Sequence, residues 1–258
     1  MAFNELQRMH QDLNRALKKP MSKRSWRMVV DARKCVGCYA CTVACTAENV
    51  CPPGTSYRWV FETEHKGYPG VEAFFMPANC QQCDNAPCMK AANKIVGGAI
   101  TKRDDGIVVF DYKKLKKNVA AREAAKAACP YYAIVDDDGG TYTAGTPKLE
   151  PYETRTIYEG DRKITRKQTQ GSIRKCTFCL HRLESGMLPA CVSTCIGRAM
   201  YFGDRNDPKS LVSELLATES TFNPKSGQGT KPRVDYIGYQ GRTEVAASTS
   251  ATCRECHQ

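Results

Sequence analysis

The chain has 258 residues, enough for one or two domains, and 41% of them are hydrophobic. Its mean hydropathy of -0.49 is low for a protein with a large apolar core, and it has no apolar run of about 18 residues that could span a membrane. The net charge of +11 comes from dispersed basic residues without a recognition motif, which favours solvated surface or a protein docking face over nucleic-acid binding.

The first predicted element is an amphipathic helix within residues 1–19. Its apolar residues recur at helical spacing along one face: Phe3, Leu6, Met9, Leu13 and Leu17. The segment lacks the apolar core and cleavage site of a secretory signal. The basic stretch 18–24 lacks the arginine pair and apolar run of a twin-arginine signal. We therefore expect an N-terminal helical extension over residues 1–26.

A run of cysteines follows a short predicted strand at residues 28–30. Cys35, Cys38, Cys41 and Cys45 have the C-x2-C-x2-C-x3-C spacing of bacterial ferredoxins, in which three thiolates hold one iron–sulfur cluster and the fourth reaches a neighbouring one. Fifteen cysteines in this length indicate either disulfides or metal. Two-residue gaps repeated in one loop suit disulfides poorly, and structural zinc favours paired C-x2-C knuckles. The spacing therefore indicates iron–sulfur clusters and single-electron chemistry.

Two further cysteine groups lie downstream, and a single cysteine lies between them. Their members are Cys80, Cys83 and Cys88; Cys176, Cys179, Cys191 and Cys195; and the solitary Cys129, which precedes Pro130. Residues 106–110 and 199–202 are predicted as short strands beside these groups. Such short pieces cannot form a core alone, so we expect the clusters to supply it.

The polar segment 136–172 is predicted as an inserted surface hairpin, with contact to a catalytic partner as the alternative. Residues 210–216 are expected to form a helix, and the remainder to Gln258 to wrap a partner as irregular chain. The tail residues Cys253, Cys256 and His257 match C-x-x-C-H, the attachment motif of c-type haem. Haem, a small metal or redox pair, and an unoccupied tail all stay open.

Other candidate ligands have simpler interpretations. Cys51 is expected to be a plain small residue, with a contribution to cluster packing as the alternative. His10, His65 and His181 are expected to be surface or hydrogen-bonded residues without metal. The sequence contains no nucleophile with a paired base, no glycine-rich phosphate loop and no framed carboxylate pair. We therefore expect a subunit that performs no catalysis itself. Backbone amides near Gly37, Ala40 and Thr177 are suited to donate to cluster sulfurs and tune their potentials.

Residues 27–236 closely resemble the four-cluster iron–sulfur electron-transfer subunit of the dimethyl-sulfoxide reductase family of molybdopterin oxidoreductases, which includes polysulfide, tetrathionate and arsenate reductase small subunits. The resemblance rests on several segments besides the first cysteine group: 47–49 (AEN), 52–54 (PPG), 80–88 (CQQCDNAPC), 129–131 (CPY), 175–179 (KCTFC), 189–191 (PAC), 202–208 (FGDRNDP) and 229–234 (GTKPRV).

The resemblance implies two ferredoxin-like modules, which pair the first cysteine group with the fourth and the second with the third. In the outer module, one cluster would take Cys35, Cys38, Cys41 and Cys195, and a second would take Cys176, Cys179, Cys191 and Cys45. In the inner module, Cys129 would complete a third cluster with Cys80, Cys83 and Cys88.

The fourth cluster site lacks every ligand. The second group's last cysteine is replaced by Ala92. Counting back from Cys129 places the third group's other positions at Val119, Arg122 and Ala125, whereas counting forward from the preceding strand gives Leu115, Asn118 and Ala121. Because all missing ligands belong to one cluster, we interpret the loss as clean removal of one site. Residues 116–128 are rich in helix formers, which predicts an alanine-rich helix that fills the vacated volume and ends at Pro130.

The predicted fold class is α+β, with two bacterial-ferredoxin-like dicluster modules, long irregular insertions and a wrapping C-terminal tail. The expected segments are the extension 1–26, the outer module 27–78 and 173–205, the inner module 79–135, the insertion 136–172 and the tail 206–258. By resemblance, the outer module lies nearer the molybdenum subunit, and the lost site is the one nearest a membrane quinone-reactive subunit.

The sequence thus predicts a three-cluster electron-transfer subunit, with iron as its metal, bound to a molybdopterin or tungstopterin catalytic subunit. The complex is expected to be membrane-associated, with this chain peripheral on either side and a quinone-reactive subunit or cytochrome as a second partner. Two alternatives stay open: a subunit of a transmembrane quinone-linked complex without a pterin enzyme, and a cluster protein used for structure or sensing.

Overall fold

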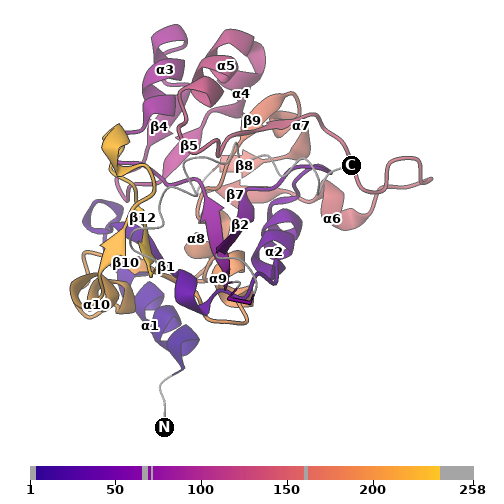
Figure 1. The fold of residues 1–258 in the computed structure, drawn as a ribbon. Helices are drawn as coiled ribbons and strands as arrows, with labels where there is room; N and C mark the ends of the chain where they lie inside the picture. The colour runs from indigo at the N-terminus through magenta and orange to yellow at the C-terminus, as the bar shows by residue number, and fades with distance from the viewer. Residues whose placement is uncertain (1–3, 66–68, 71, 160–161, 239–258) are drawn as a thin grey trace.

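The computed structural model describes residues 4–65, 69–70, 72–159 and 162–238. Helices and strands are mixed throughout, as the α+β prediction requires. Figure 1 shows α3, α4 and α5 gathered at one end of the molecule and the sheet that contains β1, β10 and β12 at the other, near α1 and α10. The cysteine-bearing loops connect these two ends.

The largest sheet has the strand order β10-β1-β12-β11. Its strands are β1 (Trp26–Asp31), β10 (Met200–Asp204), β11 (Thr221–Phe222) and β12 (Val234–Ile237). β1 runs antiparallel to β10, with Met28 opposite Phe202, and parallel to β12, with Met28 opposite Val234. The ring of Phe202 packs between Trp26, at a centroid distance of 5.5 Å, and Phe178, at 5.2 Å. This apolar stack joins the sheet to the loop that carries the third cysteine group.

One part of the tail prediction is wrong. The sequence predicts irregular chain after residue 216, but β11 pairs with β12, and β12 lies inside the sheet. Residues 223–233 connect these two strands, and the 3-10 turn η3 (Ser226–Gln228) lies within this connection. The strands are too short to show alternation in the sequence, and β12 is stabilised by pairing with β1, which lies about 200 residues earlier in the chain.

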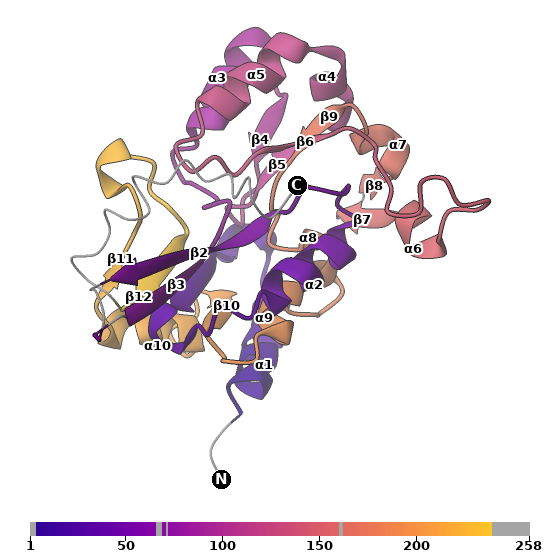
Figure 2. The same ribbon diagram turned by 45° about the vertical axis from the view of Figure 1, so that its right-hand side comes forward.

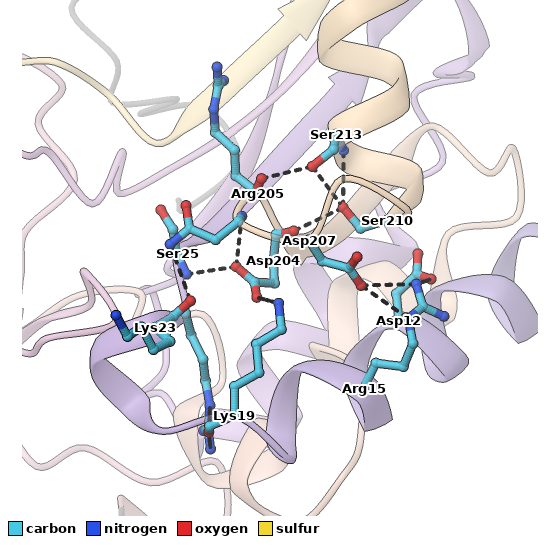
Figure 3. Close-up of polar contacts among 12 residues, drawn as sticks. Asp12, Arg15, Lys19, Lys23, Ser25, Asp204, Arg205, Asp207, Ser210 and Ser213 are labelled. Carbon is cyan, nitrogen blue, oxygen red and sulfur yellow. Dashed lines mark hydrogen bonds and ion pairs between the residues drawn. The ribbon is translucent and has the colours of Figure 1, made fainter.

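Helix α1 (Glu5–Leu17) confirms the predicted N-terminal helix, and Asn4 caps it by accepting a hydrogen bond from the Leu6 amide. Met9 and Leu13 are buried, whereas Phe3 lies outside the described residues. Figure 3 shows how polar side chains join this end of the chain to the segment after β10. Arg15 pairs with Asp207 at 3.0 Å and also with Asp12 at 2.5 Å, and Lys19 pairs with Asp204 at 2.7 Å.

Several short elements lie near this junction. The 3-10 turns η1 (Met21–Lys23) and η2 (Ala32–Lys34) flank β1. Helix α10 (Leu211–Thr218) confirms the helix expected over residues 210–216, and Ser210 caps it by accepting from the Ser213 amide. In Figure 3, Ser210 and Ser213 face one another beside the Asp207 turn. These contacts hold α1 and α10 against β10.

The longest strands, β2 (Arg58–His65) and β3 (Glu72–Asn79), form an antiparallel pair that the sequence analysis did not predict. Arg58 is opposite Asn79, and Phe61 is opposite Met76. β2 follows the first cysteine group, and β3 leads into Cys80. The pair therefore connects the outer and inner cysteine loops, as Figure 2 shows from the side.

The inner region consists of α3 (Pro87–Ile95), β4 (Ile100–Lys102), β5 (Val108–Phe110), α4 (Tyr112–Lys117) and α5 (Val119–Ala127). β5 confirms the strand expected near residues 106–110, and β4 pairs with it. The alanine-rich helix expected over residues 116–128 is divided into α4 and α5, because the Asn118 side chain accepts from the Ala121 amide and caps a new helix. The second helix ends before Pro130, as predicted.

No thiol occupies the positions assigned to the fourth cluster. α3 packs directly against α5, and small apolar side chains of both helices are fully buried: Ala92 on α3, and Ala121 and Ala125 on α5. Leu115 of the adjacent α4 is fully buried as well. Arg122 points back to the end of α4 and donates to the carbonyls of Leu115, at 3.1 Å, and Lys116, at 2.9 Å. Packed side chains therefore occupy the positions where the fourth cluster's cysteines were expected.

This close packing makes Ala125 sensitive to size. We expect Ala125→Leu to lower the free energy of unfolding by about 1–3 kcal/mol, because the added atoms must enter the filled α3–α5 contact. Ala120→Leu, on the exposed face of the same helix, should change it by less than about 0.5 kcal/mol. Anaerobic urea unfolding followed by circular dichroism measures both. Equal stability of the two variants would contradict the tight α3–α5 packing.

The segment 136–172 is not one hairpin. It contains α6 (Pro151–Thr154), α7 (Arg166–Thr169) and the antiparallel pair β7 (Ile157–Glu159) and β8 (Arg162–Ile164). β6 (Val135–Asp137) pairs with β9 (Ser172–Arg174) and closes the segment at its base. The expected hairpin is thus confirmed only for the pair of β7 and β8, and residues 160–161 between them lie outside the described residues. β9 also packs against α4. Lys175 and Cys176, which directly follow β9, therefore lie beside the inner region.

Candidate metal centre

The first set of thiols, termed site 1, consists of Cys35, Cys38, Cys41 and Cys195. These side chains line one cavity together with Val36, Val60 and Met200, among others. Cys38 is exposed, Cys35 is half-buried, and the other two are buried. Helix α2 (Ala40–Asn49) carries Cys41 and also Cys45, which lies about one helical turn further along and belongs to the next site.

Two glycines allow the loops of site 1 to come together. Gly37 has a φ of +66°, and a side chain there would meet the ring of Phe75 at 2.5 Å. Gly197 lies so close to the other loop that an added Cβ would stand 2.4 Å from the Lys34 carbonyl oxygen. Glycine at these positions therefore lets Cys195 approach the first cysteine run, although the two are far apart in the sequence.

Site 2 consists of Cys45, Cys176, Cys179 and Cys191, all of them buried. Burial raises the pKa of Cys45 well above its ordinary value, and the adjacent thiols of Cys179, Cys176 and Cys191 add to the effect. Helix α8 (Leu180–Glu184) begins directly after Cys179, and α9 (Ala190–Thr194) carries Cys191. α9 packs against α2, which brings the two thiol-bearing helices together.

Site 3 consists of Cys80, Cys83, Cys88 and Cys129, which line a second cavity with Lys175 and Tyr131, among others. Burial raises the pKa of both Cys83 and Cys88 to about 12. The structure thus brings the solitary cysteine beside the second cysteine group. Thiols surround the cavities rather than meet at a point, since within the described residues no three His, Cys, Asp or Glu side chains form a single-ion site.

Site 2 neighbours both of the other sites. Helix α9, which carries Cys191, packs against α2, which carries Cys41 of site 1. Asn79, the residue before Cys80 of site 3, approaches Cys176 Sγ of site 2 at 3.6 Å. Burial is the largest cause of the raised pKa of Cys41 and of Cys176, but the thiol of Cys191 likewise contributes to the former and that of Cys80 to the latter.

Hydrogen-bond donors approach several of the sulfurs. The amide of Phe178 donates to Cys176 Sγ at 3.3 Å, and the amide of Ala199 donates to Cys195 Sγ at 3.2 Å. The Gly37 amide approaches Cys35 and lowers that thiol's pKa, although burial, the largest effect, raises it. Amide donors are thus found at Gly37 and, next to Thr177, at Phe178, as expected. Donors of this kind favour the more negative, reduced form of a cluster.

Side-chain amides form a second class of donor that the sequence analysis missed. Asn49 Nδ2 lies 3.5 Å from Cys45 Sγ and 3.9 Å from Cys179 Sγ. Asn79 Nδ2 lies 3.6 Å from Cys176 Sγ. Both asparagines are buried. Asn49 belongs to the segment 47–49 that carried the family resemblance, which was the available signal.

The remaining candidates belong to none of the three thiol sets. Cys51 is buried beside Arg174, Tyr57 and Asp137, and it also neighbours Cys45 of site 2. His181 Nε2 lies 2.9 Å from Glu48 Oε1, which makes it part of a hydrogen-bonded structure, as expected.

Glu48 also pairs with Arg182 at 2.9 Å. The bond to His181, with help from the nearby Arg182 and Arg155, lowers the Glu48 pKa to about 2. The interaction ties α2 to α8 behind site 2.

The C-terminal part of the prediction falls on residues that the structure does not describe. The C-x-x-C-H residues Cys253, Cys256 and His257 lie outside the described residues, and so does the end of the predicted tail. Within the described part of the chain, no helix is both long and apolar enough to cross a membrane.

Comparison with known proteins identifies the family. A 4Fe-4S dicluster domain matches residues 71–146 and 154–205. The chain is 47% identical over 233 residues to a selenate reductase subunit of Mesobacillus selenatarsenatis, covering 89% of this chain and 77% of that protein. It is 34% identical over 217 residues to a tetrathionate reductase subunit of Salmonella typhimurium, covering 83% and 72%.

The arsenate respiratory reductase iron-sulfur subunit of Shewanella sp. is 34% identical over 228 residues, which cover 81% of this chain and 94% of that protein. The chain belongs to the iron–sulfur subunits of the molybdopterin reductase family. It is accordingly an electron-transfer protein that binds 4Fe-4S clusters. Thiol-only donor sets of four fit such clusters in this chain: those of sites 1 and 3 surround cavities, and that of site 2 is wholly buried.

Proposed function

We propose that this protein relays single electrons through three [4Fe-4S] clusters, bound at sites 1, 2 and 3, between a molybdopterin or tungstopterin catalytic subunit and a second redox partner. The observation that carries the proposal is that site 2 neighbours both other thiol sets, with Cys41 near Cys191 and Cys176 near Cys80. A cluster bound at each site would have a neighbour to exchange electrons with. We further propose that sites 1 and 2 belong to an outer ferredoxin-like module (residues 27–78 and 173–205) and site 3 to an inner one (residues 79–135).

Sites 1 and 3, the two ends of the proposed relay, have different surfaces. At site 1, Val36 and Ile196 expose 59% and 67% of their surface beside the exposed Cys38. Apolar residues exposed around a redox centre suit a protein partner, so we assign this end to the catalytic subunit. The relatives from Mesobacillus and Salmonella are each named as one subunit of a reductase, which agrees with a chain that works in a complex.

Site 3 forms the opposite end. A surface cavity of about 250 Å³ lies over Cys129 and is lined by Lys90, Tyr132 and Gln228, among others. The alanine-filled α3–α5 contact occupies the place of a fourth cluster, so electrons would leave from site 3 itself. We assign this end to the second partner, in a complex that is peripheral to a membrane.

Iron quantification tests the number of clusters. We expect about twelve irons per chain, because each of three cubane clusters contains about four. Anaerobic purification, iron and sulfide analysis and electron paramagnetic resonance of the reduced protein provide the measurement. About sixteen irons would refute the missing site, and clusters that cannot be reduced and reoxidised reversibly would refute electron transfer.

A further inference from the structure

Arg58 is a buried cation without an acidic partner. It opens β2, and only 1% of its surface is exposed. Its Nη2 donates to Asn79 Oδ1 at 3.0 Å and contacts Met28 Sδ at 3.0 Å. Its Nη1 has no hydrogen-bond partner, and no carboxylate of the described residues pairs with it.

Several other buried charges of the described residues have an ionic partner, although Lys175, whose Nζ donates to the Val108 and Cys176 carbonyls, does not. Arg174 is also buried, but it pairs with Asp137 at 3.2 Å. The buried carboxylates Asp105 and Asp204 are paired as well, with Arg103 at 3.0 Å and Lys19 at 2.7 Å. Burying a charge without a counterion costs several kcal/mol. The negative charge that offsets Arg58 must therefore come from a group other than these carboxylates.

The neighbours of Arg58 are cysteines of two sites. Cys41 belongs to site 1, and Cys191 and Cys176 belong to site 2; all three interact electrostatically with the guanidinium. Asn79 links the same guanidinium to Cys176, because its side-chain oxygen accepts from Arg58 while its Nδ2 approaches Cys176 Sγ at 3.6 Å. The free Nη1 is buried in the same region. Arg58 therefore lies between the two outer sites.

We infer that Arg58 is a positioning residue that sets the reduction potentials of the two outer clusters, with its charge shared between sites 1 and 2 and its free Nη1 available to their sulfurs. The inference rests on the proposed occupancy of these sites. A cluster gains one negative charge when it accepts an electron, and a fixed cation nearby stabilises that charge. Removal of the cation disfavours reduction at both outer sites, whereas site 3, which lacks this neighbour, keeps its potential.

The test is a redox titration of the complete protein, followed by electron paramagnetic resonance. Arg58→Met should lower the equilibrium constant for one-electron reduction of both outer clusters at least tenfold, which corresponds to about 59 mV. Arg58→Lys keeps the charge and should give a clearly smaller shift. Lys113→Met removes one exposed positive charge from α4 and should leave all three potentials unchanged.

The signal of the site 3 cluster is assigned from its loss in Cys129→Ala. Unchanged outer potentials in Arg58→Met would overturn the inference, and so would an equal shift at site 3. Iron content is measured first on the unaltered chain, so a failure of the three-cluster proposal is recognised separately. If Arg58→Met does not accumulate with full iron, Arg58→Gln replaces it, and a lysine variant whose potentials fall as far as those of the glutamine variant overturns the role of charge.

Discussion

Replacing Cys129 with alanine should remove about four of the expected twelve or so irons per chain and leave the rest in place. Cys129 is the ligand of site 3 that comes from a separate segment, after α5, and it lies in the same cavity as Cys80, Cys83 and Cys88. Without it, one corner of the cubane has no thiolate. Sites 1 and 2 take no ligand from this segment, so their clusters should persist.

Loss of the site 3 cluster should also interrupt electron transfer. Because site 3 is the last member of the proposed relay, its loss should abolish turnover with the second partner while site 1 remains reducible. Reduction kinetics and electron paramagnetic resonance measure both effects in the same sample.

Cys51→Ala is the matched control, because Cys51 is also a buried free thiol and neighbours Cys45 of site 2, but it belongs to none of the three ligand sets. It should retain all of the iron. Full iron content in Cys129→Ala would show that site 3 does not need this ligand, and iron loss in Cys51→Ala would show that the ligand assignment is wrong.

Removal of iron should unfold most of the molecule. Most cysteines of the three sites are buried, and only Cys38 is exposed. Without iron, the thiols of sites 1 and 3 would surround cavities that protein atoms do not fill, and each cavity costs stability. Because metal binding is coupled to folding in such sites, we expect the iron-free chain to lose its cooperative unfolding transition.

The same coupling predicts a pH dependence. Burial raises the pKa of Cys83 and Cys88 to about 12, so in the folded chain without iron these thiols are protonated at neutral pH. Cluster binding requires thiolates and therefore releases protons. Lower pH should then weaken iron binding, and higher pH within the stable range should strengthen it.

Anaerobic treatment with a chelator, followed by near-ultraviolet circular dichroism and urea unfolding, provides the measurement. Chelator-treated protein that is supplied with iron and sulfide should recover the transition. A cooperative transition of undiminished size in iron-free protein would show that the apolar packing suffices, contrary to our expectation.

Much of the site could be predicted from local sequence, because cluster ligands follow strict spacing. The spacing of the four cysteines from Cys35 to Cys45 indicates iron–sulfur binding by itself, without information from other parts of the chain. The amphipathic spacing of α1 and the helix formers around Ala121 are equally local signals. The division at Asn118 was missed because an N-cap inside a helical pattern competes with continuation of the helix, and only packing decides the outcome.

The remaining features depend on contacts between distant segments. The strands β2 and β3 contain charged and apolar residues without clean alternation, and β12 is stabilised by pairing with β1. The buried position of Arg58 follows from the place of β2 behind the two outer sites. A charged residue at a strand end ordinarily indicates exposure, so the sequence alone could not suggest a role for it.

β12 is synthesised after all the ligand cysteines of sites 1, 2 and 3, and it pairs in parallel with β1, the first of the described strands. Arg233, just before β12, donates through its backbone amide to the Gln81 carbonyl at 2.8 Å and through Nε to Asp84 Oδ1 at 2.6 Å. The segment synthesised last among the described residues thus joins the first strand to the loop of site 3. A ribosome that has made residues 1–190 has produced neither Cys191 nor Cys195, so sites 1 and 2 each lack a ligand until that segment has been synthesised. Insertion of iron at these sites must therefore wait for it, and the thiols made earlier must be protected from oxidation until then.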